Sequence, residues 1–586
     1  NDAWWGAGFT EWNNVTRALP QFEGHRQPRL PADLGFYDLR NPDVMRRQAA
    51  LARTHGIGAF CFYTYWFDGR VLLDEPVEAW RADPSNDLPW CLCWANEDWT
   101  RRWEGRPGET LVAQAHGPQD DVAFIAHFAP HLRDPRYLRV DGRPLLLVYR
   151  AELLPDARAT AQRWRDWCRE HGVGEIALAC VQSFQQHAPT QFCFDFAVEF
   201  PPNTHSPRDI TAAQHATNPY HAGTVLDWRE LAAAWQQRGV APSWLFPAVN
   251  CGWDNEPRRP GQGHTYLHAS PRRYRDWLAD TVHRRLGERP RGTRLAFVNA
   301  WNEWAEGAVL EPDQALGHAW LQATRSALSP RPAGLRPLQV VVHAWYPDVF
   351  GEILDALQAL PMPWELTVTT SEPRQAAVRA ELDARSLDAR LQVHENRGRD
   401  ILPFLEVADA LLDGGDAVVL KLHTKRSPHR GDGDAWRREL VASLTDPHAV
   451  QEAIRELGRP GADVGLVGPR GHVVCAEQHV GGNAATLAYL RARLGLEGPA
   501  PKQFFAGSMF ITTLHALRPL LDAHLGRWEF EPEAGQLDGT MAHAIERVIT
   551  ACVEAQGLRW IESPPPAGGN GGDQAGPDQP RPKSQE

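Results

Sequence analysis

Two glutamates in one short segment have the type and spacing that could support acid–base chemistry. Glu303 and Glu306 lie three residues apart in FVNAWNEWAEG. Cleavage of a glycosidic bond needs an acid that protonates the departing oxygen and a base or nucleophile that stabilises the oxocarbenium-like centre. Crowding by neighbouring Trp side chains would raise the pKa of one carboxyl group and separate the two roles. The spacing alone is equally compatible with a solvated turn that carries two ordinary glutamates.

Seven short apolar runs alternate with amphipathic helical stretches between residue 1 and about residue 327. Apolar strands with helices between them predict a parallel sheet covered on its outer face. The closed form of such a series is a (β/α)8 TIM-type barrel, with one strand unaccounted for. The predicted strands are 56–66, 88–97, 143–150, 175–183, 194–200, 244–253 and 294–303.

Each of these runs becomes polar or aromatic at its carboxyl end, where barrel enzymes place their chemistry. Tryptophan is abundant, with 24 residues in 586. Aromatic faces pack on pyranose rings while polar neighbours bind the hydroxyl groups, so a sugar site is one interpretation and a buried core is the other. Glu97 and Glu199 could hold sugar hydroxyls or could pair with an arginine. The candidate substrate contacts at the strand ends are Tyr63, Trp66, Trp94, Asn96, Glu97, Glu199, Trp253, Asp254, Asn302 and Trp304.

A second α/β series follows a Pro/Gly-rich linker at 328–337 and extends over 338–562. Repeated βα units in an open order predict a doubly wound, glycosyltransferase-like sheet. The tail 563–586 is Pro/Gly-rich and polar, and we expect it to be disordered.

Basic residues in this second region could bind a nucleotide diphosphate without a metal ion, because they are predicted to lie at strand ends. No DxD sequence ends a strand there, which disfavours a metal-dependent transferase. Asp400 could act as a base or pair with Arg399. A basic patch that merely solvates the surface is the alternative. The candidate donor-binding residues are Arg397, Arg399, Asp400, Lys421, His423 and Lys425.

Composition narrows the class of protein. The 73 acidic against 61 basic residues argue against a nucleic-acid partner. No apolar run is long enough to span a bilayer, although peripheral membrane association stays compatible with the sequence. The nine cysteines are scattered, which favours reduced thiols in a cytoplasmic protein. No cluster has metal-ligand spacing, so we expect neither a metal nor a cofactor beyond a nucleotide-sugar donor.

Five motifs, in order, resemble the WbsX-like family of bacterial surface-polysaccharide proteins, which is similar to the endo-α-mannosidase family of glycoside hydrolases. They are WWGAGFTEWNNV, QPRLPADLGFYDLR, FCFYTYWFDG, CLCWANEDWTRRWEG and FVNAWNEWAEG, and the resemblance covers about residues 1–325 of the predicted first domain, 1–327. The resemblance implies a (β/α)8 barrel. Family members carry a strand before the WWG segment, so the first barrel strand is expected to be missing, in line with the count of seven.

The resemblance also implies roles. Glu303 would deprotonate the sugar 2-hydroxyl to close a 1,2-anhydro intermediate, and Glu306 would act as general acid and then base, with retention. Glu11 and Trp12 would join Trp94, Asn96 and Glu97 in the pocket wall. The region 338–562 resembles rhamnan synthesis protein F, through VVVHAWYPD, NRGRDILPFL, VLKLHTKRS and FFAGSMF. That family is regarded as sugar transferases, of rhamnosyl groups above all.

The combined hypothesis is a bimodular enzyme of O-antigen, capsule or rhamnan biosynthesis. Its barrel would be a hydrolase or a transglycosylase, and its second module would transfer a sugar from a nucleotide donor. The substrate would be a polysaccharide or oligosaccharide, with a lipid-linked form and a place at the inner face of the membrane both compatible. The alternative is a non-catalytic glycan-binding scaffold, whose glutamates only bind hydroxyl groups.

Overall fold

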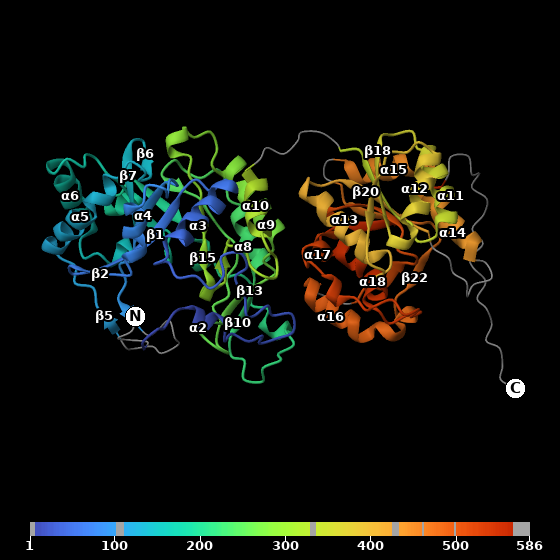
Figure 1. The fold of residues 1–586 in the computed structure, drawn as a ribbon, viewed down its shortest axis with the longest axis horizontal. Coiled ribbons are helices and arrows are strands. Elements are labelled where there is room, and N and C mark those ends of the chain that lie inside the picture. Colours follow the sequence, from blue (N-terminus) through green and yellow to red (C-terminus); the bar gives the residue numbers. More distant parts are fainter. Residues whose placement is uncertain are drawn as a thin grey trace. The chain divides into compact units, whose positions relative to one another are not determined.

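The computed structural model describes residues 6–100, 110–328, 336–424, 433–459, 462–496 and 500–565. The chain divides into two compact units, Asn1–Arg331 and Pro332–Glu586 (Figure 1), and each unit is described by itself. Most of the predicted linker and of the predicted tail lies outside the described residues.

Parallel strands form the centre of the first unit. Six of them are hydrogen-bonded neighbours in the order β11-β9-β8-β7-β3-β1. β12 follows β11 after one residue and pairs in parallel with β14, so all seven predicted strands occur in sequence. Their bounds are β1 (Phe60–Phe67), β3 (Trp90–Trp94), β7 (Arg143–Val148), β8 (Ala177–Gln182), β9 (Phe196–Glu199), β11 (Leu245–Phe246), β12 (Ala248–Asn250) and β14 (Phe297–Asn299).

No closed barrel is found in the described part of the chain, and the predicted TIM-type barrel is not confirmed. Among the described residues β14 and β1 share no ladder, and β1 pairs with β3 and with the short antiparallel β2. The Trp301 ring lies 5.0 Å from the Phe60 ring, so side chains rather than backbone hydrogen bonds connect the two ends of the strand series. The unit is therefore a mixed α/β fold with a parallel sheet.

Strand alternation sorts the side chains of β1 onto two faces. Trp66 packs against Phe124 of helix α5 (Pro118–Leu132), with ring centroids 5.9 Å apart. Tyr63 and Tyr65 differ from Trp66 in parity, so they lie on the opposite, inner face of the sheet. Figure 1 shows α5 and α6 outside β7, at the edge of this unit.

Capping side chains mark the N-terminal ends of two outer helices. Asn41 caps α3 by accepting a hydrogen bond from Asp43 N, and Pro42 occupies the first helical position. Asp156 caps α6 in the same way through Ala159 N. The helices are α2 (Trp12–Val15), α3 (Pro42–Thr54), α4 (Glu75–Ala82), α5, α6 (Ala157–Glu170), α7 (Pro201–Thr204), α8 (Trp228–Gln236), α9 (Pro271–Asp280) and α10 (Ala319–Leu328). The minor strands are β2 (Arg70–Leu72), β4 (Trp99–Thr100), β5 (Thr110–Val112), β6 (Arg139–Val140), β10 (Thr224–Asp227), β13 (His264–Leu267), β15 (Asn302–Glu303) and β16 (Ala308–Val309).

The second unit is built on a seven-stranded sheet of order β19-β18-β17-β20-β24-β21-β25. All strands run parallel except β24, which is antiparallel to both of its neighbours. The chain moves outward from β17 to β19 and then returns to the other side of β17 as β20. The strands are β17 (Leu338–His343), β18 (Trp364–Thr370), β19 (Arg390–Val393), β20 (Val418–His423), β21 (Val464–Gly468), β24 (Phe510–Thr513) and β25 (Arg559–Glu562), with β22 (Val473–Cys475) and β23 (Gln503–Phe505) as a separate pair.

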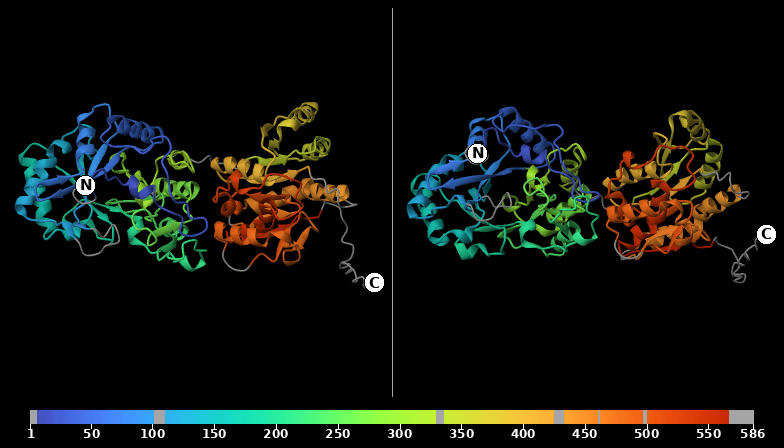
Figure 2. Two further views of the ribbon diagram at one scale, coloured as in Figure 1. Left: turned by 60° about the horizontal axis from the view of Figure 1, so that its bottom comes forward. Right: turned by 90° about the horizontal axis from the view of Figure 1, so that it is seen from below.

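Helices cover both faces of this sheet. On β17, Val340 and Val342 join the core beneath α11, α12, α14 and α15, whereas Val341 joins the core beneath α13 and α16–α18. Figure 2 shows α11 and α12 (yellow) and α16–α18 (orange to red) on different sides of the unit. The bounds are α11 (Pro347–Gln358), α12 (Gln375–Ala384), α13 (Ile401–Asp413), α14 (Gly433–Thr445), α15 (Pro447–Gly458), α16 (Ala484–Leu494), α17 (Arg518–Leu521) and α18 (Met541–Glu554).

The cysteines take the predicted form. All nine cysteines are free thiols, and most of them are buried. In the described parts of the chain, no helix is long and apolar enough to cross a bilayer, and no three His, Cys, Asp or Glu side chains are grouped to hold a metal ion.

Candidate active site

The segment that carries Glu303 and Glu306 forms a tight hairpin. β15 ends at Glu303, one 3₁₀ turn follows, and β16 returns in antiparallel pairing. Gly307 closes the turn with φ +67°, and a Cβ atom there would lie 2.8 Å from Asp254 N. Both the positive φ and the close approach require glycine at this position.

One guanidinium group joins three carboxylates at this hairpin. Arg258 Nη1 donates to Glu306 Oε1 at 2.5 Å, and Arg258 Nε donates to Glu11 Oε2 at 2.9 Å. Arg258 Nη2 lies 3.5 Å from Glu303 Oε2. Because a guanidinium fork is small and rigid, the carboxyl groups of Glu303 and Glu306 lie within about 8 Å of each other, which permits a shared role at one glycosidic bond.

These contacts set the protonation of the carboxyl groups. Burial raises the pKa of Glu306 to about 7, against the lowering effect of Arg258 and with a further rise from Glu303 and Glu11. Burial also raises the pKa of Glu303, with Arg258 again opposing it. The Glu306 side chain is 11% exposed and that of Glu303 is 32% exposed, so Glu306 is the more strongly desolvated. Near neutral pH Glu306 can hold or release a proton, as a general acid–base group must.

Arg258 was not among the site residues predicted from the sequence. It lies in the loop that follows the strand end Trp253-Asp254, within a Pro-Arg-Arg run that looks like ordinary surface. Burial alone would lower the pKa of Arg258, but Glu306, Glu11 and Glu303 outweigh burial and raise it. The signal that could have identified it is a pair of adjacent arginines in the loop after a neighbouring strand, which could reach the acidic hairpin.

Tyrosines on the inner face lie close to these carboxylates. The Tyr63 and Tyr149 rings are 5.8 Å apart. Burial raises the pKa of Tyr65, and the charges of Glu303 and Glu306 raise it further, so Tyr65 lies within electrostatic reach of both. Tyr63 was a predicted contact, whereas Tyr65 and Tyr149 belong to strand ends that the sequence identified without assigning them a role.

A buried network supports the hairpin. Asn302 Nδ2 donates to Tyr37 Oη at 3.0 Å, and Tyr37 Oη donates to Glu311 Oε2 at 2.8 Å. Trp304 Nε1 donates to the same Glu311 oxygen at 2.8 Å. Trp12 packs its ring 5.6 Å from that of Trp304. Because Trp304 is only 5% exposed, it supports the hairpin and does not present a face to a substrate, which corrects its predicted role.

Two further predicted contacts lie on the outer face of the sheet. Trp94 is fully buried and packs against Phe124 of α5, with ring centroids 4.4 Å apart. Trp66 Nε1 donates to Asp120 of the same helix at 2.7 Å. The predicted substrate contacts of Trp66 and Trp94 are therefore wrong, because strand alternation turns both side chains toward the helices.

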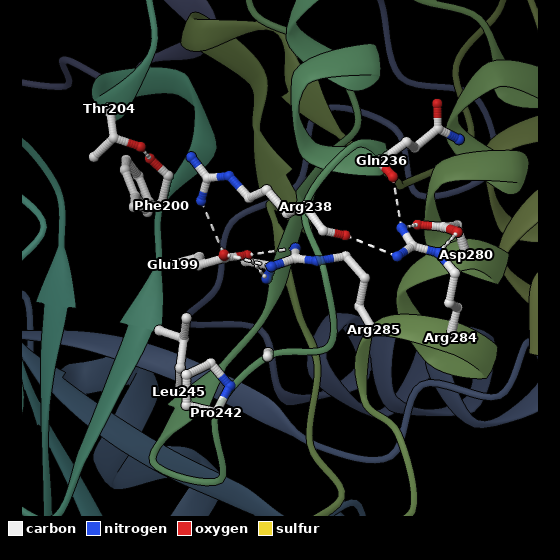
Figure 3. A network of polar contacts seen from close by, with 12 residues as sticks. Glu199, Phe200, Thr204, Gln236, Arg238, Pro242, Leu245, Asp280, Arg284 and Arg285 are labelled. Atoms are coloured by element: carbon white, nitrogen blue, oxygen red, sulfur yellow. Dashed lines mark hydrogen bonds and ion pairs between the residues drawn. The ribbon is translucent and has the colours of Figure 1, made fainter.

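Glu199 lies in a closed ion cluster at the end of β9 (Figure 3). Arg285 donates to both of its carboxylate oxygens at 2.8 Å, and Arg238 Nη1 donates at 3.0 Å. Burial alone would raise the pKa of Glu199, but Arg285 and Arg238 hold it below its ordinary value. Of the two interpretations that the sequence left open, the structure shows the pairing with arginine.

Asn96 and Glu97 connect the ends of β3 and β7. Asn96 exchanges two hydrogen bonds with the backbone of Arg150, each of 2.8 Å, and it is fully buried. Arg150 Nη1 donates to Glu97 Oε1 at 2.7 Å, and the Glu97 side chain is 30% exposed. Asn96 therefore has a structural role, which corrects its predicted contact, while Glu97 stays a predicted substrate contact.

Asp254 joins the N-terminal loop to the hairpin. Asp254 Oδ2 accepts hydrogen bonds from His25 Nε2 at 2.8 Å and from Gln27 Nε2 at 2.7 Å. Asp254 N donates to Glu306 O at 2.6 Å. Asp254 thus positions the segment of Glu306, and the half-buried Trp253 beside it stays a predicted contact.

In the second unit, three predicted donor-binding residues meet where the strand order reverses. Lys421 Nζ donates to Asp400 Oδ2, and it donates to Ser508 O at 2.7 Å. His423 Nε2 donates to Gly507 O at 2.7 Å and lies 3.9 Å from Asp400 Oδ2. Burial alone would raise the pKa of Asp400, but His423 and Lys421 hold it well below its ordinary value. Asp400 is therefore an ionised partner of Lys421.

The two predicted arginines of this unit contact a different segment. Arg397 Nη1 donates to Phe530 O at 2.7 Å, and Arg399 Nη1 donates to His543 Nε2 at 2.9 Å. They hold the segment that leads into α18, and their donor-binding role stays a prediction. Lys425 lies outside the described residues.

The chain belongs to the family described as glycosyltransferase WbsX, whose model matches residues 1–324. The model of rhamnan synthesis protein F matches residues 333–558. Both assignments agree with the resemblances carried by the sequence motifs. The two matches fall on the two compact units.

Two curated relatives are similar along nearly the whole chain. Each is described as "Uncharacterized protein WxcX", from Xanthomonas campestris pv. campestris strains B100 and ATCC 33913. Each is 55% identical over 565 residues, which cover 95% of this chain and 81% of the relative. A solved structure described as a glycoside hydrolase-like protein is 15% identical with a TM-score of 0.36, and it covers 55% of this chain and 92% of that one.

Proposed function

We propose that this chain is a two-unit enzyme of bacterial surface-polysaccharide assembly. The first unit acts on glycosidic bonds, and the second transfers a sugar, a rhamnosyl group, from a nucleotide donor. The two family memberships support this substrate class. The acceptor would be a polysaccharide or oligosaccharide, in lipid-linked form at the inner face of the cytoplasmic membrane.

The main support for an activity of the first unit is the contact of Arg258 with both Glu303 and Glu306. This contact holds the two glutamates together, while Glu306 has a pKa of about 7. Following the resemblance to endo-α-mannosidases, Glu303 takes the proton of the sugar 2-hydroxyl. That oxygen attacks the anomeric carbon, the glycosidic bond breaks, and Glu306 protonates the departing oxygen. The result is a 1,2-anhydro sugar.

In the second half of the cycle Glu306 takes a proton from the incoming group as that group opens the anhydro ring. Glu303 returns its proton to the 2-oxygen, and the configuration is retained. Water as the incoming group gives hydrolysis, whereas a sugar hydroxyl gives transfer. The carboxylate pair supports both outcomes equally.

Substitution of the pair tests this mechanism. Glu303→Gln and Glu306→Gln should each lower turnover by about a thousandfold, because each removes a proton-transfer group. The readout is mass spectrometry of the surface glycan in cells that carry each variant in place of the wild type. The exposed Glu170→Gln is the matched control and should leave the glycan unchanged.

The same experiment separates the enzyme from a glycan-binding scaffold. Full turnover in both glutamine variants would contradict the catalytic assignment. A wild-type protein that binds the glycan without ever changing it would favour the scaffold. Loss of turnover in both variants, with glycan binding retained, is the result that the enzyme requires.

For the second unit, the carrying observation is the cluster at the strand-order reversal between β17 and β20. Open α/β sheets bind ligands at the carboxyl ends of strands at such a point. Lys421 and His423 end β20 there, and His343 ends β17. Titration calorimetry with nucleotide-activated rhamnose, with and without EDTA, is the test. Binding that survives EDTA supports the metal-free site, and binding lost on chelation would overturn it.

A further inference from the structure

An exposed aromatic ring at the end of β8 has no part in the mechanism above. Phe184 follows Ser183 beyond the last residue of β8, and it is 51% exposed. Its ring is covered on one side, because the guanidinium carbon of Arg150 lies 4.5 Å from the ring centroid. One isolated apolar residue on a surface is ordinary. Its surroundings are what distinguish this one.

The guanidinium group over this ring is held in place from two sides. Arg150 Nη1 donates to Glu97 Oε1 at 2.7 Å, and Arg150 Nε donates to Glu152 Oε1 at 2.5 Å. Glu97, Arg150 and Phe184 follow β3, β7 and β8, which are adjacent strands of one sheet. The aromatic face, the donor and the acceptor therefore lie at neighbouring strand ends and are held there by contacts with each other and with Glu152.

Tyr149 connects this group with the candidate active site. Its ring packs against Tyr63 on one side at 5.8 Å and against Phe200 on the other at 5.7 Å. Burial raises the pKa of Tyr149, and the charges of Glu97 and Glu306 raise it further. Tyr149 thus lies within electrostatic reach of both carboxylates, and it immediately precedes Arg150 in the chain.

We propose that Phe184, Arg150 and Glu97 form a distal sugar-binding subsite, which takes a neutral pyranose of the same glycan whose scissile bond lies at Glu303 and Glu306. The C–H face of the ring packs on Phe184, Arg150 donates to hydroxyl oxygens, and Glu97 accepts from hydroxyl groups. The subsite rests on the proposed function, and it deepens it by naming the residues that bind a sugar of the glycan away from the scissile bond.

Chain-length dependence of binding tests the subsite. The probes are α-linked manno-oligosaccharides and rhamno-oligosaccharides of two to six units, titrated calorimetrically into the full chain with Glu306→Gln to prevent turnover. Affinity should rise with length in at least one series. Adding Phe184→Ala should lower the affinity for the longest probe about tenfold, and it should lower the affinity for the shortest probe by less. Phe184→Trp should keep the rise.

Two matched variants separate ring stacking from other effects. Phe184→Leu keeps an apolar side chain without an aromatic face, and it should lose affinity as Phe184→Ala does. Leu153→Ala removes another exposed apolar side chain, 42% exposed, from the turn after Arg150, and it should change nothing. If Phe184→Leu binds the longest probe as tightly as the parent, stacking is absent and the subsite is wrong.

The outcomes distinguish the subsite from the function on which it rests. Equal losses at every probe length would overturn the subsite, because Phe184 would then act on the whole site. Probes that bind with affinity independent of Phe184 would also overturn it, and would leave the proposed function standing. A parent protein that binds no probe of either series would overturn the proposed function together with the subsite.

Discussion

Two arginine–carboxylate clusters of the first unit are made of the same residue types and behave in opposite ways. At the end of β9, the single carboxylate of Glu199 meets two arginines. At the β15–β16 hairpin, the single guanidinium of Arg258 meets three carboxylates. The pKa of Glu199 is lowered, whereas that of Glu306 is raised to about 7.

Burial does not explain this difference, because it raises the carboxyl pKa in both clusters. The ratio of charges, together with a hydrogen bond of 3.1 Å from Ala248 N to Glu199 Oε2, explains it. Two cations around one anion overcompensate the desolvation of Glu199, and the carboxylate stays ionised. One cation shared among three anions leaves Glu306 undercompensated, and it can bind a proton. The first cluster is suited to stability and the second to proton transfer.

The largest expected effect on stability comes from breaking the cluster around Glu199. Glu199→Gln leaves Arg285, whose side chain is 2% exposed, without its anion, and we expect the free energy of unfolding to fall by about 3 kcal/mol. Differential scanning calorimetry of the full chain measures this as a lower transition temperature for the first unit. Turnover of the remaining folded protein should be retained.

Its control is the neighbouring pair Arg284–Asp280 in Figure 3, which is partly exposed on both sides. Asp280→Asn should cost less than about 1 kcal/mol, because water screens the pair. Glu199→Gln with no greater cost than Asp280→Asn would contradict a stabilising role. Lost turnover with unchanged stability would instead place Glu199 in contact with the substrate.

The order and the approximate positions of the strands in the first unit could be predicted from the sequence. Apolar runs that alternate with amphipathic helical stretches predicted all seven strands of the first unit, because both signals are local. Closure of the ring depends on backbone pairing between the first and the last strand of the series, and no local signal carries that information. In the second unit the apolar segment FFAGSMFIT does not form one continuous strand. It forms two short strands, since Gly507 and Ser508 both adopt positive φ.

The site was predictable in part. Glu303, Glu306 and Glu11 come together as expected, because two of them share a hairpin and the third belongs to a recognisable motif. Trp66 and Trp94 were predicted on the wrong face of the sheet. The sequence shows where a strand ends, but it does not show which of the alternating side chains face the helices. Arg258 was missed, because its contacts join segments more than 240 residues apart in one case.

The pH dependence of stability sharpens the comparison. Glu199, whose pKa is held below the ordinary 4.5, stabilises the fold above that pH, and this contribution is lost as pH falls through the folded-state pKa. Glu306, with a folded-state pKa of about 7, has the opposite sign. Between pH 4.5 and 7 the folded state binds more protons than the unfolded chain, so stability falls as pH rises.

Glu306→Gln removes this second dependence. Relative to wild type, the variant should gain up to about 3 kcal/mol in the free energy of unfolding between pH 4 and pH 8. Urea unfolding followed by tryptophan fluorescence at several pH values measures the difference. Wild type and variant with parallel pH profiles would show that Glu306 has an ordinary pKa, and the charge-ratio argument would then fail.

The smallest expected effect comes from substituting Arg258, whose guanidinium group lies between the glutamates. Because the charge of Arg258 lowers the pKa of Glu306, Arg258→Met should raise it, and the alkaline limb of the pH–rate profile should move up by about one pH unit, or about 1.4 kcal/mol. Arg258→Lys keeps a positive charge and should leave the limb near pH 7. Arg259→Met removes the adjacent arginine and should also leave it in place. A limb that stays fixed in Arg258→Met would mean that a group other than Glu306 is the acid, because no charge change of this size can occur beside Glu306 without moving its pKa.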